Sequence, residues 1–500
     1  MALKVNEQSD AVKTMALEWA VLEALNGGTP AMRVAGKDHL PQWPSEESSS
    51  YAARLRTATL FPAYKRTVVV MAAKPFSKEL TLSDDTPGQI KSLAEDIDLQ
   101  GVSLHNFAAE MFVETLGFGL AGVLVDYPDT RAKDDKGQPK PGPQRTVAQV
   151  EAEGLRPYFV RVRHDQILGW RTALVGGKLR LTQLRLSESR EADDGDFGSD
   201  CIPQVRVLTP GAWALWEEVS TDKGKEWQQV DAGSTSLDYV PFVPFYGRRD
   251  AFMIGAAPLL DLAYLNVKHW QSQSDQDTIL HAARVPILAM FGADEKTSLV
   301  IGGSAAVSFS TADADLKWVE HSGAAIGAGK ESLADLQEQM IETGAELLIK
   351  RPGKRTATES AGDQEANKSD LQRAAETFED SLDKALQIVA DYIKAPTGGT
   401  VSLFKDYGAT SLSDASATLV KDLQMAGLLS KETTLRELQR RGVLSADLDL
   451  ADELAAATAD GPPPGSMGTD AQGNPLPLTP SPKVTNIKKN PDGSMTATQG

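Results

Sequence analysis

The sequence predicts an α+β protein in which long helices accompany a β-rich region. From Glu365 to Lys394, apolar residues recur at spacings of three and four over about eight helical turns. Short alternating segments separated by Gly and Asp turns run from Tyr158 to Pro244 and predict an antiparallel meander. Two further helical patterns, from Ala257 to Ala283 and from Glu331 to Ile349, are separated by a compact apolar, Gly-rich insert.

The helix predicted from Ala257 to Ala283 has an unusual polar centre. Pro258 suits a first helical position, and the pattern stops before the Val-Pro pair at 285–286. From Gln271 to Thr278 the chain has neither an apolar side chain nor a positive charge. A helix that loses its apolar stripe for two turns is not expected to lie along a monomer's core. We therefore expect this segment to project into solvent, line a channel or contact other subunits.

The helix predicted from Glu365 to Lys394 combines an apolar stripe with an acidic face. Average globular helices have about 11–12 residues, so an apolar stripe from Leu371 to Ile393 is exceptional. One interpretation is a long surface helix of a large domain. The other is that the stripe cannot be covered within one chain and contacts further subunits. The acidic residues of the other face are Asp370, Glu376, Glu379, Asp380, Asp383 and Asp391.

Shorter elements are predicted in the rest of the chain. Helices are expected at 7–26, 46–73 and 104–116, a buried strand at 121–125, strand fragments within 285–319, a strand at 401–408 and short helices within 414–457. The last forty residues hold 8 Pro, 6 Gly and no aromatic residue, a composition that predicts disorder.

Composition and charge exclude several classes of protein. The net charge of −18 argues against a protein that grips nucleic acid, because phosphate binding requires a basic surface. An acidic wall would instead let a duplex slide past. The single cysteine, Cys201, excludes internal disulfides and thiolate metal clusters. The sequence begins without the apolar core of a secretory signal, and its longest apolar run, 285–291, is too short to span a bilayer, so we expect a soluble protein made in a cytoplasm, with no membrane partner.

The sequence offers no catalytic constellation and no site for a cofactor or metal. The stretch from Gly323 to Lys330 resembles a phosphate loop, but Ala324 stands where that loop needs glycine and Glu331 where it needs Ser or Thr. The six histidines lack metal-binding spacing, and no nucleophile-elbow or dinucleotide motif occurs in its proper context. We therefore expect a protein that is not an enzyme.

Five segments in a fixed order resemble one known family. They are HLPQWPSEESSSYAARLRTATLFPAYKRTV (39–68), GVLVDYP (122–128), PLLDLAYLNVKHWQSQSDQDTILHAARVPIL (258–288), TATES (356–360) and GLLSKETTLRELQRRGVL (427–444). In this order the chain is similar, over roughly residues 10–455, to the portal proteins of tailed double-stranded DNA bacteriophages. No single segment is a chemical signature, and the resemblance rests on their order.

The resemblance implies a division of the chain into the parts of a portal subunit. These parts are a wing (1–256), a first stem helix (257–284), a clip (285–328), a second stem helix (329–349), a tunnel loop (350–364), a channel helix with a returning wing strand (365–410), crown helices (411–458) and a disordered tail (459–500). Portals form rings, typically of twelve copies, at one vertex of the capsid. The implied location is the virion, after assembly in the host bacterial cytoplasm.

The resemblance also implies partners and candidate surfaces. The ring would contact the major capsid protein, dock the large terminase and later the head-completion or adaptor proteins, and conduct double-stranded DNA without sequence specificity during packaging and ejection. The residues expected to face DNA are Lys350, Arg351, Lys354 and Arg355 of the tunnel loop and Asp370, Glu376, Asp380 and Asp383 of the channel helix. Asp313 and Glu320 are expected on the partner-binding surface of the clip.

Two other classes of protein stay open at this point. A different virion structural or scaffolding protein would also be acidic and non-catalytic, but it would not need a compact β insert between two stalk helices. An enzyme of unrecognised type would place its site in the β-rich region, with Trp213, Trp216 and Asp238 in a cleft.

Overall fold

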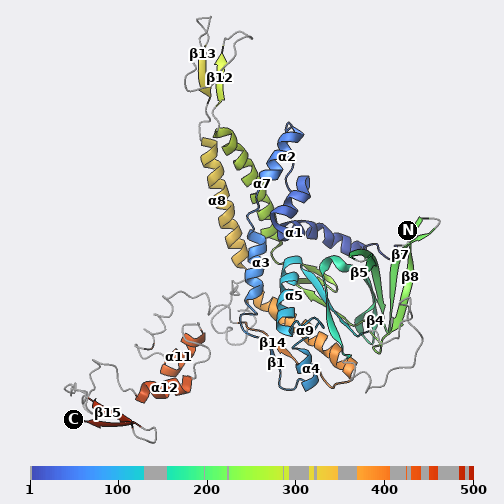
Figure 1. Cartoon of the computed structure of the whole chain (residues 1–500), viewed down its shortest axis with the longest axis vertical. Coiled ribbons are helices and arrows are strands. Elements are labelled where there is room, and N and C mark those ends of the chain that lie inside the picture. Colours follow the sequence, from blue (N-terminus) through green and yellow to red (C-terminus); the bar gives the residue numbers. More distant parts are fainter. Residues whose placement is uncertain are drawn as a thin grey trace. The chain divides into compact units, whose positions relative to one another are not determined.

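The predicted α+β class is confirmed by the computed structural model, which divides into two units, Met1–Tyr407 and Gly408–Gly500 (Figure 1). The structure describes residues 3–128, 155–195, 197–221, 224–284, 287–291, 315–319, 324–346, 369–405, 424, 430–440, 450–459, 484–489 and 495–499.

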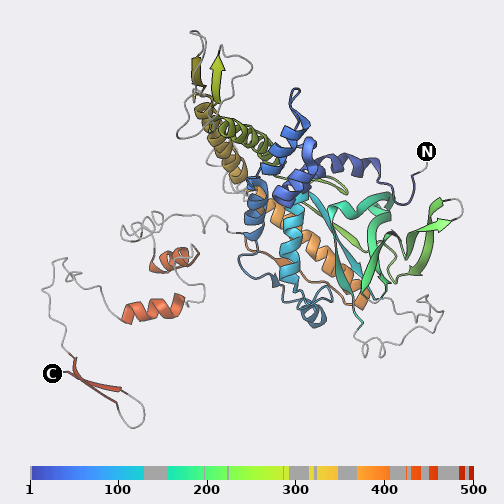
Figure 2. The ribbon, with the colours of Figure 1, turned by 45° about the horizontal axis from the view of Figure 1, so that its top comes forward.

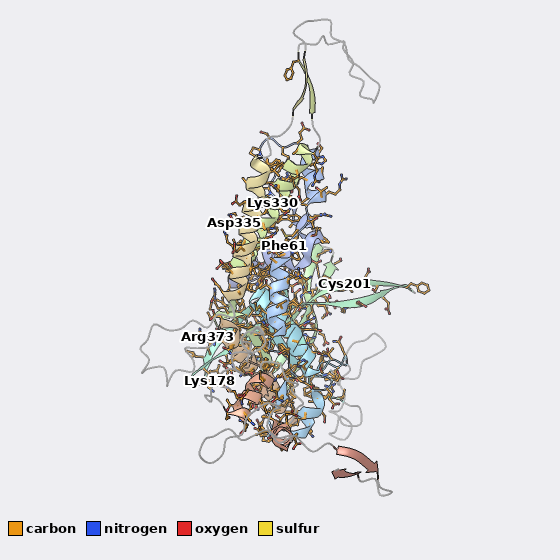
Figure 3. The ribbon with its side chains drawn as sticks, turned by 90° about the vertical axis from the view of Figure 1, so that its left-hand side faces the viewer. Phe61, Lys178, Cys201, Lys330, Asp335 and Arg373 are labelled. Atoms are coloured by element: carbon orange, nitrogen blue, oxygen red, sulfur yellow. The ribbon has the colours of Figure 1, made fainter. Side chains whose placement is uncertain are left out.

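Two long helices of the first unit lie side by side and form a stalk (Figures 1 and 2). They are α7 (Leu260–Ala283) and α8 (Ala324–Ala345). Between them in the chain, β12 (Ile287–Phe291) pairs in antiparallel fashion with β13 (Asp315–Val319). α7 ends where the sequence predicted, whereas α8 begins inside the Gly-rich stretch that was expected to precede it. Figure 3 shows Lys330 and Asp335 on α8.

A three-stranded antiparallel sheet lies at the centre of the first unit. Its order is β3 (Tyr158–Val162), β2 (Leu120–Asp126) and β9 (Phe242–Tyr246). Every residue of β2 except its last is buried, which confirms the predicted buried strand. Gly122 is required there, because an added Cβ would lie 2.0 Å from the ring of Phe242 on the paired strand.

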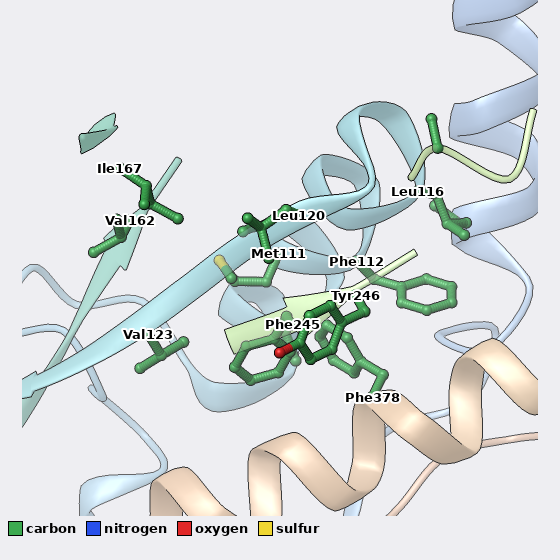
Figure 4. Close-up of a cluster of buried hydrophobic side chains, with 14 of the residues drawn as sticks. Met111, Phe112, Leu116, Leu120, Val123, Val162, Ile167, Phe245, Tyr246 and Phe378 are labelled. Carbon is green, nitrogen blue, oxygen red and sulfur yellow. The ribbon is translucent and has the colours of Figure 1, made fainter. Parts of the chain in front are cut away.

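Two helices, α5 (Leu104–Phe118) and α9 (Asp370–Ile393), pack on this sheet and complete the core. Phe112 of α5, Phe245 of β9 and Phe378 of α9 meet in one aromatic cluster (Figure 4). The ring centroid of Phe378 lies 5.0 Å from that of Phe112 and 4.9 Å from that of Phe245, both in edge-on geometry. Such pairs add to the stabilisation from buried area.

The structure corrects the interpretation of the long apolar stripe. The apolar residues of α9 from Leu371 to Val389 are buried within the same chain, so covering them does not require another subunit. The helix also starts later than predicted. Ser369 and Gln372 form a capping box, which fixes the first helical residue at Asp370. At the other end Lys394 adopts a left-handed conformation and stops the helix.

The middle of the meander predicted from Tyr158 to Pro244 is a five-stranded antiparallel sheet in sequential order, whereas its first and last strands, β3 and β9, belong to the central sheet. The strands of the five-stranded sheet are β4 (Ile167–Val175), β5 (Lys178–Asp194), β6 (Gly198–Thr209), β7 (Ala212–Thr221) and β8 (Gly224–Ser234). Arg206 of β6 ties it to the central sheet, because its guanidinium lies 2.9 Å from the Asp126 carboxylate of β2 and 2.8 Å from Glu188 of β5.

The N-terminal helices contain two breaks. α1 (Asp10–Ala35) is interrupted at Gly28, whose backbone is non-helical, so the predicted end of the first helix agrees with this break, but a second helical segment that contains Pro30 continues to Ala35. The single helix predicted at 46–73 is two helices, α2 (Ser48–Thr57) and α3 (Ala63–Ala73), because Pro62 interrupts it. The short elements η1 (Gly36–Asp38), α4 (Gly88–Leu93) and η2 (His164–Gln166), and the hairpin of β10 (Arg248–Ala251) with β11 (Ile254–Ala256), were not predicted.

A strand pair joins two distant parts of the first unit. β14 (Val401–Ser402), which follows α9, pairs in antiparallel fashion with β1 (Thr81–Leu82). This confirms a strand after the long helix, although it is shorter than the predicted 401–408.

The second unit contains α11 (Lys431–Arg440) and α12 (Leu450–Ala459), as predicted for short helices. Against expectation, the last forty residues include an antiparallel pair, β15 (Val484–Lys489) and β16 (Met495–Gln499). The sequence between these strands includes Asn-Pro-Asp-Gly, a turn signal that composition alone does not reveal.

Candidate channel and partner surfaces

The stalk is held together along one narrow seam. On α8 the buried apolar side chains are Leu333, Leu336 and Met340, spaced three and four residues apart. The seam continues at Gly344, where an added Cβ would lie 3.0 Å from the side chain of Thr67 in α3. Most other positions of α8 are exposed, including Ile341, which is 73% exposed.

The polar centre of α7 packs inside the chain, which corrects the expectation that it could not. Ser274 and Gln276 are buried, and Gln276 Nε2 donates a hydrogen bond to the Ile326 carbonyl of α8 at 3.1 Å. Gln271 Nε2 donates to the His39 carbonyl at 3.0 Å. The amide side chains of Gln271 and Gln276 thus replace apolar packing by hydrogen bonds to backbone carbonyls, whereas the buried Ser274 hydroxyl has no hydrogen-bonding partner among the described residues. The sequence pattern could not show this, since the partners lie on other elements.

A buried arginine fastens the N-terminal helices to the stalk. The Arg54 guanidinium of α2 bonds both carboxylate oxygens of Glu46 at 2.8 Å and lies 3.8 Å from Asp275 of α7. It also stacks on Trp43, with 4.3 Å to the ring centroid. The hydrogen bond from Arg54 holds the pKa of Glu46 below its usual value, whereas burial raises the pKa of Asp275.

A line of carboxylates runs along the side of α8 that is opposite the seam. Glu331, Asp335, Glu338 and Glu342 are all exposed and follow one another at spacings of four, three and four. This spacing places them on one face of the helix. The sequence analysis did not predict this line, although the spacing of four, three and four residues is visible in the sequence.

The four acidic residues predicted on α9 do not form one exposed line. Only Asp380 is exposed. Asp383 is half-buried and accepts a hydrogen bond from the Val401 backbone N–H at 2.7 Å, and burial raises its pKa. Asp370 lies 3.5 Å from Arg373, and Glu376 is half-buried. The exposed line of α9 is of mixed charge and consists of Arg373, Thr377, Asp380, Lys384 and Gln387.

The other predicted site residues lie outside the described residues. These are the basic residues Lys350, Arg351, Lys354 and Arg355 and the clip residues Asp313 and Glu320. Within the part of the chain that the structure describes, no cluster of His, Cys, Asp or Glu could hold a metal ion, and no helix is long and apolar enough to cross a membrane.

The cleft considered for an enzyme does not assemble from the three residues named for it. Trp216 lines a groove on the five-stranded sheet, together with Trp170 and Trp227, but neither Trp213 nor Asp238 does. Trp213 instead packs over Gly233, where an added Cβ would lie 2.7 Å from its indole ring.

The comparisons with known proteins give one partial match to a family and several distant structural similarities. A family model described as a domain of unknown function (DUF4055) matches residues 258–393, about a quarter of the chain. This segment contains the whole of α7, α8 and α9. No curated protein matches the chain.

Among solved structures, the chain is similar to a chain in the neck of a native GTA particle computed with C12 symmetry, at 14% identity and a TM-score of 0.37 over 80% of this chain and 96% of that chain. It is similar to a chain in the neck of an empty GTA particle computed with C6 symmetry, at 13% identity and a TM-score of 0.36 over 82% and 97%. A chain in the virion of a native gene transfer agent particle is 14% identical, with a TM-score of 0.35 over 80% and 96%.

Proposed function

We propose that this protein is a portal, a ring-forming virion protein at one capsid vertex through which DNA is packaged and ejected. The observation that carries the proposal is the stalk, in which α7 and α8 share one narrow seam and a two-stranded ladder is inserted between them. Among the described residues, β12 and β13 pair only with each other. An isolated two-stranded ladder is marginally stable in water, so contacts with neighbouring subunits would stabilise it.

The exposed surface of α8 favours a ring over a free stalk. Identical contacts repeated with a fixed rotation close into a ring, and side-by-side stalks would cover Ile341 in every copy. The carboxylates of α8 would then face the central channel, multiplied by the number of subunits. A wall of like charge repels the duplex and keeps it centred, which suits DNA that must slide and not bind. We assign the acidic wall to α8 in place of α9.

The remaining surfaces are proposed from the sequence. Lys350, Arg351, Lys354 and Arg355 would form a basic collar that contacts phosphates transiently, because a few such contacts add little affinity at physiological salt. The segment that includes Asp313 and Glu320 would be the clip, where the large terminase and later the head-completion proteins dock. The major capsid protein would contact the wing. The similarity to the gene transfer agent chains is too distant to support these assignments, which rest on the geometry and sequence of this chain.

Negative-stain electron microscopy of the purified protein tests the proposal. We expect ring-shaped particles with a central channel, and particles of the same form after Glu331, Asp335, Glu338 and Glu342 are changed together to Gln or Asn. The acidic line is exposed and, in the proposed ring, faces the channel, so it should not be needed for assembly. Compact single subunits in every micrograph would contradict the proposed function.

A further inference from the structure

The five-stranded sheet carries a groove that the proposed function does not use. The groove has a volume of about 650 Å³ and is bordered by the N-terminal residues Leu3 to Val5. Three of the chain's eight tryptophans line it, Trp170 of β4, Trp216 of β7 and Trp227 of β8, and all three are half-buried. Trp170 also packs against the main core, which fixes that end of the groove to a rigid part of the fold.

The charge of the groove is opposite to that of the chain. Lys4, Arg171, Arg185 and Lys225 line it with one carboxylate, Glu226, in a protein of net charge −18. Lys225 is paired with Glu218 at 3.1 Å. Arg171 pairs through its backbone with Gln183 of β5, and its exposed guanidinium forms no hydrogen bond or ion pair with the described residues.

Arg185 forms the best-ordered cation of the groove. Its Nη1 donates to the backbone carbonyls of Lys4 and Val5 at 2.9 and 2.8 Å, so the guanidinium is held in place without a carboxylate. Burial and the nearby charge of Arg171 lower the pKa of Arg185, and the carboxylate of Glu7 acts on that pKa in the opposite direction. Two guanidinium groups that repel each other favour an anion that binds both, since carboxylates accept paired N–H donors from arginine.

We propose that this groove binds an acidic peptide segment of a partner protein, with carboxylates on Arg171 and Arg185 and apolar side chains on the three indoles. Tryptophan and arginine are the residues that most often carry binding energy at protein interfaces. A single-stranded nucleic acid would also stack on indoles. The carboxylates beside the groove disfavour binding of a nucleic acid, because its continuous line of phosphates would lie against Glu218 of β7 and Glu226 of β8.

Isothermal titration calorimetry with a defined probe tests this proposal on the full-length protein. The probe is the end-capped peptide Gly-Glu-Leu-Glu-Leu-Gly, and its matched control replaces both glutamates by glutamine. A ten-nucleotide oligothymidylate forms the third arm. We expect saturable binding of the acidic peptide only.

Two arginine variants locate the binding to the groove. Arg171→Gln should weaken binding of the acidic peptide about five-fold or more, as expected for the loss of one charge-assisted contact. Arg180→Gln removes an exposed cation on β5 that does not line the groove and should leave binding unchanged. Circular dichroism should show both variants folded. The proposal is overturned if the acidic peptide does not bind, if the glutamine peptide or the oligothymidylate binds as tightly, or if the two variants behave alike.

Discussion

Glu379 was predicted on the exposed acidic face of a long helix, but its carboxylate has a structural role inside the protein. It is buried on α9, and its carboxylate accepts hydrogen bonds at 2.6 Å from the Leu403 backbone N–H and from Lys405 Nζ. It therefore holds the chain that leaves α9 and pairs with β1. We expect Glu379→Gln to lower the free energy of unfolding by about 2 kcal/mol, because the amide N–H₂ would face one of two donors. Equilibrium urea unfolding measures this.

The neighbouring acid is the matched control for this substitution. Asp380 is exposed on the same helix, so Asp380→Asn should change the free energy of unfolding by no more than about 0.5 kcal/mol. If both variants lost the same free energy of unfolding, the burial and the two hydrogen bonds of Glu379 would not contribute to stability as proposed.

The Glu46–Arg54 pair predicts a dependence of stability on pH. The folded state lowers the pKa of Glu46 from 4.5, chiefly through the hydrogen bond from Arg54. A carboxyl group whose pKa is lowered on folding stabilises the protein above its unfolded pKa and loses that contribution as the pH falls. We expect the wild type to lose stability below pH 4.5 more steeply than Glu46→Gln. Parallel pH profiles for the two proteins would rule out this linkage.

At the scale of elements, two glycines of α8 give a matched test of the stalk seam. An added Cβ at Gly327 would meet nothing, whereas at Gly329 it would lie 1.9 Å from Gln276 Oε1 of α7. Gly327→Ala should stabilise the protein by up to about 1 kcal/mol through helix propensity. Gly329→Ala gains the same propensity but displaces Gln276 from its hydrogen bond to Ile326, so it should be less stable than Gly327→Ala by about 1 kcal/mol. Equal stabilities in thermal unfolding would show that the seam does not depend on Gln276.

Periodicity predicted the positions of elements well where the local sequence determines them. It predicted burial poorly, because burial depends on contacts with other elements. The buried strand at Leu120–Asp126 and the end of α7 followed from apolar runs and from the Val-Pro pair. The burial of α9 did not, because a stripe of 3-and-4 spacing indicates a covered face without telling what covers it. Phe378 is covered by α5 and β9 of its own chain, so a charge placed there should unfold the subunit and say little about assembly.

The candidate site could be predicted only in part. The sequence predicted an acidic face on α9, but that helix carries no continuous exposed acidic line, since exposure depends on tertiary packing and the carboxylates of Glu379 and Asp383 bond within the chain. The groove on the five-stranded sheet was not predicted from the sequence either. Its tryptophans lie on three strands, and the shifts of register in β4–β5 and β7–β8 hide which side chains share a face.

At the scale of the whole molecule, substitutions at exposed positions of α8 test assembly without disturbing the fold of the subunit. Ile341 is 73% exposed in the single subunit, and the proposed ring buries it against the neighbouring stalk. Ile341→Glu should therefore leave the circular dichroism spectrum unchanged while shifting the protein from rings to smaller species. Glu338→Gln, a change on the acidic line of the same helix, should keep the ring. If both variants assemble like the wild type, the stalk is not the contact between subunits.

Mass photometry of the wild-type protein at several salt concentrations tests the central claim most directly. A closed ring predicts one dominant species at a large whole-number multiple of 53.6 kDa, roughly twelve-fold for a ring of the typical portal size. The mass of this species should not change when the protein is diluted. A persistent species of 53.6 kDa under every salt condition would contradict the account.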